Sequence, residues 1–283
     1  MKVLVTGGNG FIGRYVVKAA QAAGHQVLTL DNVGPVDVPA DITQPLHPIE
    51  GLDGVIHLAA FAHPTEFGRN PGLGYLVNVQ GTQQVLKMAQ ESGAKRFVFS
   101  SSAHVYGIPP KYLPSDENHP LWLQNDYTLT KILGEQLCQL YHQNHGLSYA
   151  VLRLFNAYGP GQAPGYFIPD MLVKAQSGYL KLRGAETTKD FVYVEDVARA
   201  FVLALENSYV GVINIGSGIE TSLGDVVAML GYPYQAEGTD IPTRMQAEPS
   251  RALRVLGWEP TVSLEDGLRR VRVPVEVFTL SPR

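Results

Sequence analysis

A serine, a tyrosine and a lysine stand at spacings that suit a proton-transfer site. Ser102 closes a run of three serines, Tyr127 follows 25 residues later, and Lys131 lies four residues beyond the tyrosine. Residues four apart share one helix face, one turn from each other. A phenol with a pKa of about 10 is a poor base at neutral pH, but a neighbouring positive charge stabilises the phenolate and lowers that pKa. The pattern therefore predicts a tyrosine base, a lysine that activates it, and a serine hydroxyl that donates to the substrate oxygen.

Short β-branched runs alternate with helical patterns in the first half of the chain, and these elements must position the three residues. This alternation predicts a parallel sheet with helices on both faces, a doubly wound α/β fold of the Rossmann type. The connection over 32–43 is too short for a full crossover helix. We expect strands at 3–6, 26–31, 54–58, 96–101 and 149–154, and helices at 11–23, 73–91 and 127–145.

The second half is less regular and predicts a smaller, substrate-binding part. We assign residues 1–160 to a dinucleotide-binding domain, with 189–216 returning to it, and residues 161–188 and 217–283 to the substrate-binding part. The tail from 271 to 283 alternates as a strand would, and its role stays open. Further elements are expected as helices at 167–177, 195–206, 223–230 and 249–256, and as strands at 188–194 and 210–215, the latter the last strand.

A glycine-rich turn follows the first predicted strand. Gly7 allows the tight turn, Gly10 lets the backbone approach a pyrophosphate, and Gly13 lets the helix that begins with Phe11 and Ile12 pack closely. The N-terminus of that helix would face the phosphates. An ordinary glycine-rich turn would show the same spacing, so the glycines alone are a weak signal.

Asp31 ends the second predicted strand, about 20 residues past the turn, where a carboxylate accepts hydrogen bonds from the adenosine ribose. A carboxylate there repels a 2′-phosphate, so NAD is the expected cofactor rather than NADP. Asp41 and Ile42 could contact the adenine, although a helix N-cap at Asp41 is an alternative. His57 is expected to be a packed strand-end residue, followed by small or apolar residues that leave room for the cofactor, Leu58, Ala59 and Ala60.

Composition excludes several classes of partner. The formal net charge of −4 gives no basic surface for nucleic acid, and no apolar run is long enough to span a membrane. The single cysteine, Cys138, cannot form an internal disulfide, which together with the lack of a signal-peptide cleavage pattern predicts a cytoplasmic protein. His142 and His145 have no third ligand in view, so no metal site is expected.

Characteristic segments run along nearly the whole chain. They are TGGNGFIG, LDN at Asp31, HLAA at His57, NVQGT at Asn78, SSSAHVYG at Ser100, YTLTK at Tyr127, LRLFNAYGPGQ at Leu152, KDFVYVEDVA at Lys189 and LGWEP at Leu256. Together they resemble the extended short-chain dehydrogenase/reductases of the nucleotide-sugar epimerase/dehydratase family.

The resemblance implies a role for each matching residue. Ser102, Tyr127 and Lys131 would be the catalytic triad. Cofactor contacts would also come from Asn32, Asn78 and Ser100, with Asn78 orienting the active-site helix. The residues expected to contact the substrate are Ser102, His104, Tyr127, Asn156 and Lys189. Of these, Asn156 would touch the phosphates. The segment 167–175 would form a wall of the nucleotide pocket. Arg244 is the remaining candidate for a phosphate contact, with a surface salt bridge as its alternative.

Family members often pair through the catalytic helix, and Leu133, Leu137 and Leu140 permit a homodimer here.

Several reactions within the family remain open. Members that dehydrate the sugar carry an Asp-Glu pair where this chain has Ala103 and His104, so dehydration is not expected. SSSAHVYG resembles the SSSATVYG of UDP-glucose 4-epimerases, as does the pair Asp31-Asn32, which favours inversion of a sugar C4 hydroxyl through a 4-keto intermediate. The segment from Thr239 to Trp258 is closer to reductases of 4-keto-6-deoxysugars, the main alternative. A non-catalytic dinucleotide sensor is a remote alternative, since it has no use for a phenolate.

Overall fold

Seven parallel strands form the large sheet of the protein. The computed structural model describes residues 1–62, 64–175, 180–238 and 240–272. All neighbouring strands of this sheet run parallel, so the predicted doubly wound α/β fold is confirmed. In spatial order the strands are β10 (Gly211–Ile215), β6 (Ser148–Leu154), β5 (Arg96–Ser102), β4 (Gly54–His57), β1 (Lys2–Thr6), β2 (Gln26–Asp31) and β3 (Val38–Pro39).

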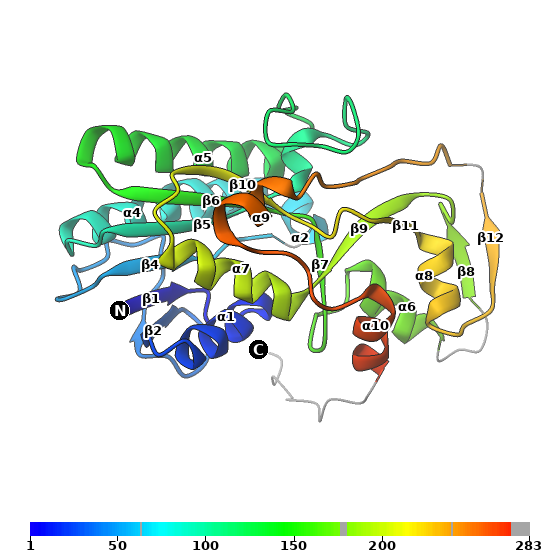
Figure 1. Ribbon diagram of the computed structural model, residues 1–283, viewed down its shortest axis with the longest axis horizontal. Helices are drawn as coiled ribbons and strands as arrows, with labels where there is room; N and C mark the ends of the chain where they lie inside the picture. The colour runs from blue at the N-terminus through cyan, green and yellow to red at the C-terminus, as the bar shows by residue number, and fades with distance from the viewer. Residues whose placement is uncertain (63, 176–179, 239, 273–283) are drawn as a thin grey trace.

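Two pairs of helices cover the sheet, one pair on each face (Figure 1). α1 (Phe11–Ala22) and α7 (Val194–Glu206) pack on the face reached by Val3 and Val5, and α4 (Thr82–Glu91) and α5 (Asp126–His145) pack on the face reached by Leu4. Successive side chains of a strand point to opposite faces, so the apolar residues of β1 contribute to the hydrophobic cores on both faces of the sheet. None of the helices in the described ranges is long and apolar enough to cross a membrane.

The helix expected over 73–91 is interrupted. The chain forms α3 (Pro71–Tyr75), then a π-helical segment from Leu76 to Gly81, and only then α4. A π-helix closes its turns with one extra residue and occurs often at functional sites. Asn78 lies in the middle of this segment and is buried.

The short connection after β2 is confirmed, because no helix lies between β2 and β3. The carboxylate of Asp37 accepts hydrogen bonds from both the amide and the hydroxyl of Thr29, each at 2.8 Å, which ties this loop to β2. These bonds lower the pKa of Asp37.

The smaller part lies beyond the carboxyl ends of the large sheet (Figure 1). It contains a three-stranded sheet in the order β11 (Glu220–Ser222), β9 (Thr188–Tyr193) and β7 (Asn156–Tyr158), and a two-stranded sheet of β12 (Tyr234–Glu237) and β8 (Leu180–Arg183). The expectation that 210–215 is the last strand is therefore wrong, because β11 and β12 follow β10. The helices of this part are α6 (Phe167–Ala175), α8 (Leu223–Met229) and α10 (Leu264–Arg272), whereas α9 (Ser250–Leu256) packs against β10 and α7 of the large sheet.

The strand expected for the tail is wrong at Val271 and Arg272, which belong to α10. There Leu268 packs in the core while arginines face outward. The remainder of that prediction, residues 273–283, lies outside the described residues, as does the end of the helix expected over 167–177.

Candidate active site

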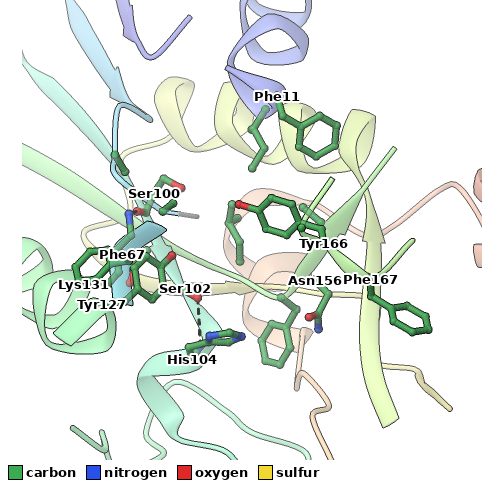
Figure 2. A pocket seen from close by; sticks show the side chains of 18 of the residues that line it. Phe11, Phe67, Ser100, Ser102, His104, Tyr127, Lys131, Asn156, Tyr166 and Phe167 are labelled. Atoms are coloured by element: carbon green, nitrogen blue, oxygen red, sulfur yellow. Dashed lines mark hydrogen bonds between the residues drawn. The ribbon is translucent and has the colours of Figure 1, made fainter. Parts of the chain in front are cut away.

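Two cavities open at the carboxyl ends of the parallel strands. The first, of about 770 Å³, lies between the large sheet and the smaller part (Figure 2). The second, of about 450 Å³, lies over the glycine turn and the end of β2. Leu58 and Ala60 line both cavities, so the two are adjacent. A crevice outside the carboxyl ends of the strands is where open α/β sheets bind their ligands.

Ser102, Tyr127 and Lys131 meet in the first cavity (Figure 2). Ser102 is the last residue of β5, and the other two lie on the first turns of α5. The helix begins at a fixed place because the Asn125 side chain accepts a hydrogen bond from the Thr128 amide at 2.9 Å. The expected juxtaposition of the three residues is thus present.

Burial sets the protonation of this group. It raises the pKa of Tyr127 to about 12, although a hydrogen bond with Ser102 acts to lower it. It also lowers the pKa of Lys131 to about 8, against the opposing effect of Glu135. The expectation that Lys131 lowers the Tyr127 pKa is therefore not met by the protein alone, because desolvation of the phenolate is the larger effect.

The Lys131 ammonium points across the end of β5. Its Nζ donates a hydrogen bond to the Ser100 carbonyl at 3.0 Å and lies 5.8 Å from the centroid of the Tyr127 ring. Lys131 is only 5% exposed. The amine is therefore positioned to reach both the tyrosine and a ligand beside Ser100.

Asn78 connects the loop after β4 to helix α5. Its side-chain oxygen accepts from the Phe61 amide at 2.7 Å, and its nitrogen donates to the Phe61 carbonyl at 3.0 Å and to the Thr130 hydroxyl at 3.1 Å. Thr130 lies directly before Lys131, so the asparagine fixes the loop after β4 against the start of α5. This position suits the orienting role that was expected of Asn78.

The glycine turn has the shape of a phosphate cradle. Gly7 adopts a φ of +70°, and a Cβ there would lie 2.7 Å from the Ala59 amide nitrogen; a Cβ on Gly13 would overlap the Gly7 carbonyl oxygen. No side chain caps α1 at Gly10, which leaves the first-turn amides of the helix available to an anion. The turn therefore fits the pyrophosphate of a dinucleotide.

The adenosine side of that cradle is the second cavity. The Asp31 carboxylate lies there and accepts hydrogen bonds from the Asn9 amide at 3.2 Å and the Asn32 amide at 2.9 Å. Asp41 accepts from the Thr43 amide at 2.9 Å within a turn, and no helix begins there, so the N-cap alternative is wrong. Predicted cofactor residues that line this cavity are Gly7, Gly10, Asp31, Asn32, Asp41, Ile42, Leu58, Ala59 and Ala60.

His57 is a packed residue, as expected. Its ring nitrogens lie 2.6 Å from the Thr6 hydroxyl and 3.0 Å from the Thr82 hydroxyl. Burial, with a smaller effect of Lys131, lowers its pKa to about 3. The imidazole is thus neutral and serves as a buried cross-link between β1, β4 and α4.

Besides Ser102 and Tyr127, three of the predicted substrate residues line the first cavity and one does not. His104, Asn156 and Lys189 lie there, and among the described residues the Lys189 ammonium has no hydrogen-bonding or ion-pair partner. Arg244 lies outside both cavities and is exposed, in a salt bridge with Glu220. The surface salt bridge is therefore the interpretation that the structure favours for Arg244.

Sequence reasoning missed Asp190, which organises the smaller part around the site. This carboxylate is fully buried and accepts hydrogen bonds from the Ser217 amide and hydroxyl at 2.7 Å each, from the Gly218 amide at 2.9 Å and from the Ala247 amide at 3.0 Å. Burial raises its pKa to about 6. The sequence did carry a signal for Asp190, which is its place next to Lys189 in β9. Side chains of a strand alternate between its two faces, so if Lys189 points into the cavity, Asp190 points away from it.

Aromatic residues that no motif indicated also shape the first cavity. Phe67 packs edge-on against the Tyr127 ring, with centroids 5.7 Å apart. Figure 2 shows the Tyr166 ring between Phe11 and Asn156. These rings leave Tyr127 and Lys131 in largely apolar surroundings, which explains the strong effect of burial on their pKa values.

The sequence and the fold are both similar to known proteins. Residues 3–216 match the NAD dependent epimerase/dehydratase family. A protein from Methanocaldococcus jannaschii with the provisional name UDP-glucose 4-epimerase is 34% identical, over 95% of this chain and 96% of that protein. UDP-glucuronic acid decarboxylase 6 of Arabidopsis thaliana is 33% identical, over 95% of this chain and 87% of that protein.

Among solved structures, UDP-glucose-4-epimerase from Stenotrophomonas maltophila has a TM-score of 0.87 to this chain at 28% identity. The similarity covers 96% of each chain, and that structure contains NAD and formylated UDP-arabinopyranose. The likeness therefore includes the smaller part as well as the large sheet.

Proposed function

Since the chain belongs to the NAD dependent epimerase/dehydratase family, we propose that it is a nucleotide-sugar 4-epimerase, which inverts the C4 hydroxyl of the sugar through a 4-keto intermediate. UDP-glucose and UDP-galactose are the proposed pair. The enzyme uses NAD, with the glycine turn holding the pyrophosphate and Asp31 facing the adenosine ribose. Bound NAD supplies the acceptor and the donor of a hydride at C4.

The protein's own residues handle the proton and the orientation of the sugar. With the positively charged nicotinamide of NAD bound beside it, Tyr127 would be held as the phenolate. The phenolate takes the proton of the C4 hydroxyl as the alcohol becomes a ketone, and returns it in the reverse step. Ser102 donates a hydrogen bond to the C4 oxygen. Lys131 holds a positive charge beside the phenol and contacts the ligand next to Ser100. Positioning of this kind, together with acid–base transfer, is worth several orders of magnitude in rate.

One observation carries the choice of epimerisation over dehydration. Ser102 is followed by Ala103 and His104, so no carboxylic acid stands where a leaving hydroxide would need a proton. Among the described residues that line the first cavity, Asp126 is the one carboxylate, and it accepts a hydrogen bond from the Tyr75 hydroxyl at 2.8 Å. The cavity thus supports oxidation and reduction of C4 without loss of a neighbouring group.

The test supplies UDP-glucose or UDP-galactose to the purified protein without added cofactor. We expect interconversion of the two sugars, detected by separation of the products, because the hydride returns to the sugar from which it came. A requirement for added NADH or NADPH and a 4-keto sugar would instead establish a reductase. Release of carbon dioxide from UDP-glucuronate, with no turnover of the neutral hexoses, would establish a decarboxylase like the Arabidopsis relative.

A further inference from the structure

His104 lies in the first cavity between Tyr127 and Ser102 on one side and Lys189 on the other. Its backbone amide donates to the Ser102 hydroxyl oxygen at 3.3 Å, and its ring stands edge-on to the Tyr127 ring with centroids 6.3 Å apart. Figure 2 shows the imidazole extending from the β5 side of the cavity toward Asn156. Lys189 is close enough to affect the titration of this imidazole.

The imidazole has hydrogen-bonding capacity that the protein does not use. Among the described residues, neither ring nitrogen of His104 has a hydrogen-bond partner, although the side chain is half-buried in the cavity wall. Burial, and to a lesser extent Lys189, lowers its pKa to about 4. The ring is therefore neutral at physiological pH, with one nitrogen as donor and the other as acceptor.

A sugar bound for reaction must pass along this wall. C1, which carries the diphosphate, and C4 lie at opposite ends of a pyranose ring. If Tyr127 and Ser102 take the C4 end and the unpaired Lys189 ammonium takes the diphosphate end, His104 faces one long edge of the ring. That edge carries either the C3 hydroxyl or the C6 hydroxymethyl group, which are attached to C3 and C5, the two ring neighbours of C4.

We propose that His104 is a specificity-determining residue that hydrogen-bonds to a sugar hydroxyl flanking C4, so that the enzyme selects fully hydroxylated hexoses. The proposal rests on the 4-epimerase function. Inversion at C4 requires the 4-keto sugar to turn over, so that its other face meets the hydride donor. This rotation also exchanges the two long edges of the ring, so His104 meets the C3 edge in one orientation and the C6 edge in the other. A group that is donor and acceptor at once can pair with a hydroxyl in either orientation.

The test compares UDP-glucose with its 3-deoxy and 6-deoxy analogues on the native protein, His104→Phe and His104→Asn. Because each flanking hydroxyl meets His104 in one of the two orientations, we expect the native enzyme to lose about 10-fold or more in kcat/KM when either of them is missing. His104→Phe should be about 10-fold slower on UDP-glucose and indifferent to the missing hydroxyl. His104→Asn, which keeps a donor and an acceptor, should retain part of the discrimination. His145→Phe, at the exposed end of α5, is the matched control and should behave as the native enzyme.

The proposal would be overturned if each deoxy sugar lowered kcat/KM by the same factor in His104→Phe as in the native enzyme. If the native protein does not turn over UDP-glucose, the 4-epimerase function has failed rather than the role of His104. The same comparison is then made with dissociation constants measured by calorimetry. An unchanged Tm and NAD content in both His104 variants shows that an altered kcat/KM comes from the site and not from misfolding.

Discussion

Glu135 and Arg153 form a two-pronged ion pair directly behind Ser102 and Lys131 of the candidate site. The Arg153 guanidinium donates to the two carboxylate oxygens of Glu135 at 2.9 and 2.6 Å, and each side chain is 4% exposed. The Ser101 hydroxyl donates to the same carboxylate at 2.6 Å. Because Glu135 lies one turn beyond Lys131, this pair fixes α5 against β5 and β6 at the level of the site.

Removing one member of this pair should be strongly destabilising. Glu135→Gln leaves a buried guanidinium without its counter-charge, for which we expect a loss of about 3–5 kcal/mol in the free energy of unfolding, measured by urea denaturation. The exposed pair between Lys87 and Glu91 is the matched control, and Glu91→Gln should cost less than about 0.5 kcal/mol. Similar losses for both variants would mean that the buried pair does not stabilise the fold.

Tyr127→Phe tests the proton-transfer role. The variant keeps the ring and its contact with Phe67 but lacks the hydroxyl, so we expect turnover to fall by about 10³-fold or more while NAD content stays unchanged. Product formation and the absorbance of the bound cofactor report the two quantities. Retention of even a tenth of the native activity would contradict the assignment of Tyr127 as the base.

Lys131→Met should stabilise the fold at neutral pH. The unfolded chain holds the lysine proton up to a pKa of about 10.5, whereas the folded lysine releases it near 8. Burial of the ammonium therefore costs stability below pH 8, and this cost shrinks as the pH rises toward 10.5. We expect the stability advantage of Lys131→Met to fall by about 2 kcal/mol between pH 7 and pH 9.5. A gap that does not change with pH would show that Lys131 is not desolvated.

His57 should make the protein sensitive to acid. Its folded pKa of about 3 lies below the ordinary value of 6.5, so the unfolded chain takes up the proton first as the pH falls. The stability from neutral His57 is complete above pH 6.5 and is lost between 6.5 and 3. Relative to His57→Gln, the native protein should lose about 3 kcal/mol between pH 7 and pH 4. The exposed His47 is the control, and His47→Gln should not change this dependence.

Gly13→Ala should prevent NAD binding or proper folding of the turn. The added Cβ would overlap the Gly7 carbonyl oxygen, which is backbone and cannot rotate away. We expect at least a 100-fold weaker NAD affinity in a titration of the variant, since the cradle must open to accept the methyl group. Gly72→Ala adds the same atom where its nearest neighbour is 3.8 Å away, and it should bind NAD as the native protein does.

The large sheet could be predicted from the sequence because its strands are buried on both faces and carry continuous apolar runs. The small strands could not. All four residues of β12, Tyr234–Glu237, are exposed and pair only with β8, so no hydrophobic pattern distinguishes them from a loop. Helix α10 was missed although Leu264, Leu268 and Val271 recur at helical spacing, because the alternating residues from Val271 onward favoured a strand.

That Ser102, Tyr127 and Lys131 lie together could also be predicted from the sequence, whereas their electrostatics could not. Spacing places Lys131 beside Tyr127, but the raised pKa of the tyrosine depends on how many apolar groups surround it, including Phe67 from a distant segment. In the same way, Arg244 offered a plausible phosphate ligand until the fold placed Glu220 beside it. Contacts between segments far apart in the chain carry this information.

The π-helical segment around Asn78 has a consequence for how the chain can change over time. An α-helix turns by about 100° per residue, so the extra residue between Leu76 and Gly81 rotates everything before it relative to α4. Deletion of any one residue there would restore regular helix geometry and carry Tyr75 away from Asp126, its hydrogen-bonding partner on α5. Descendants of this chain can therefore exchange exposed side chains along this helix, but they can hardly change its length.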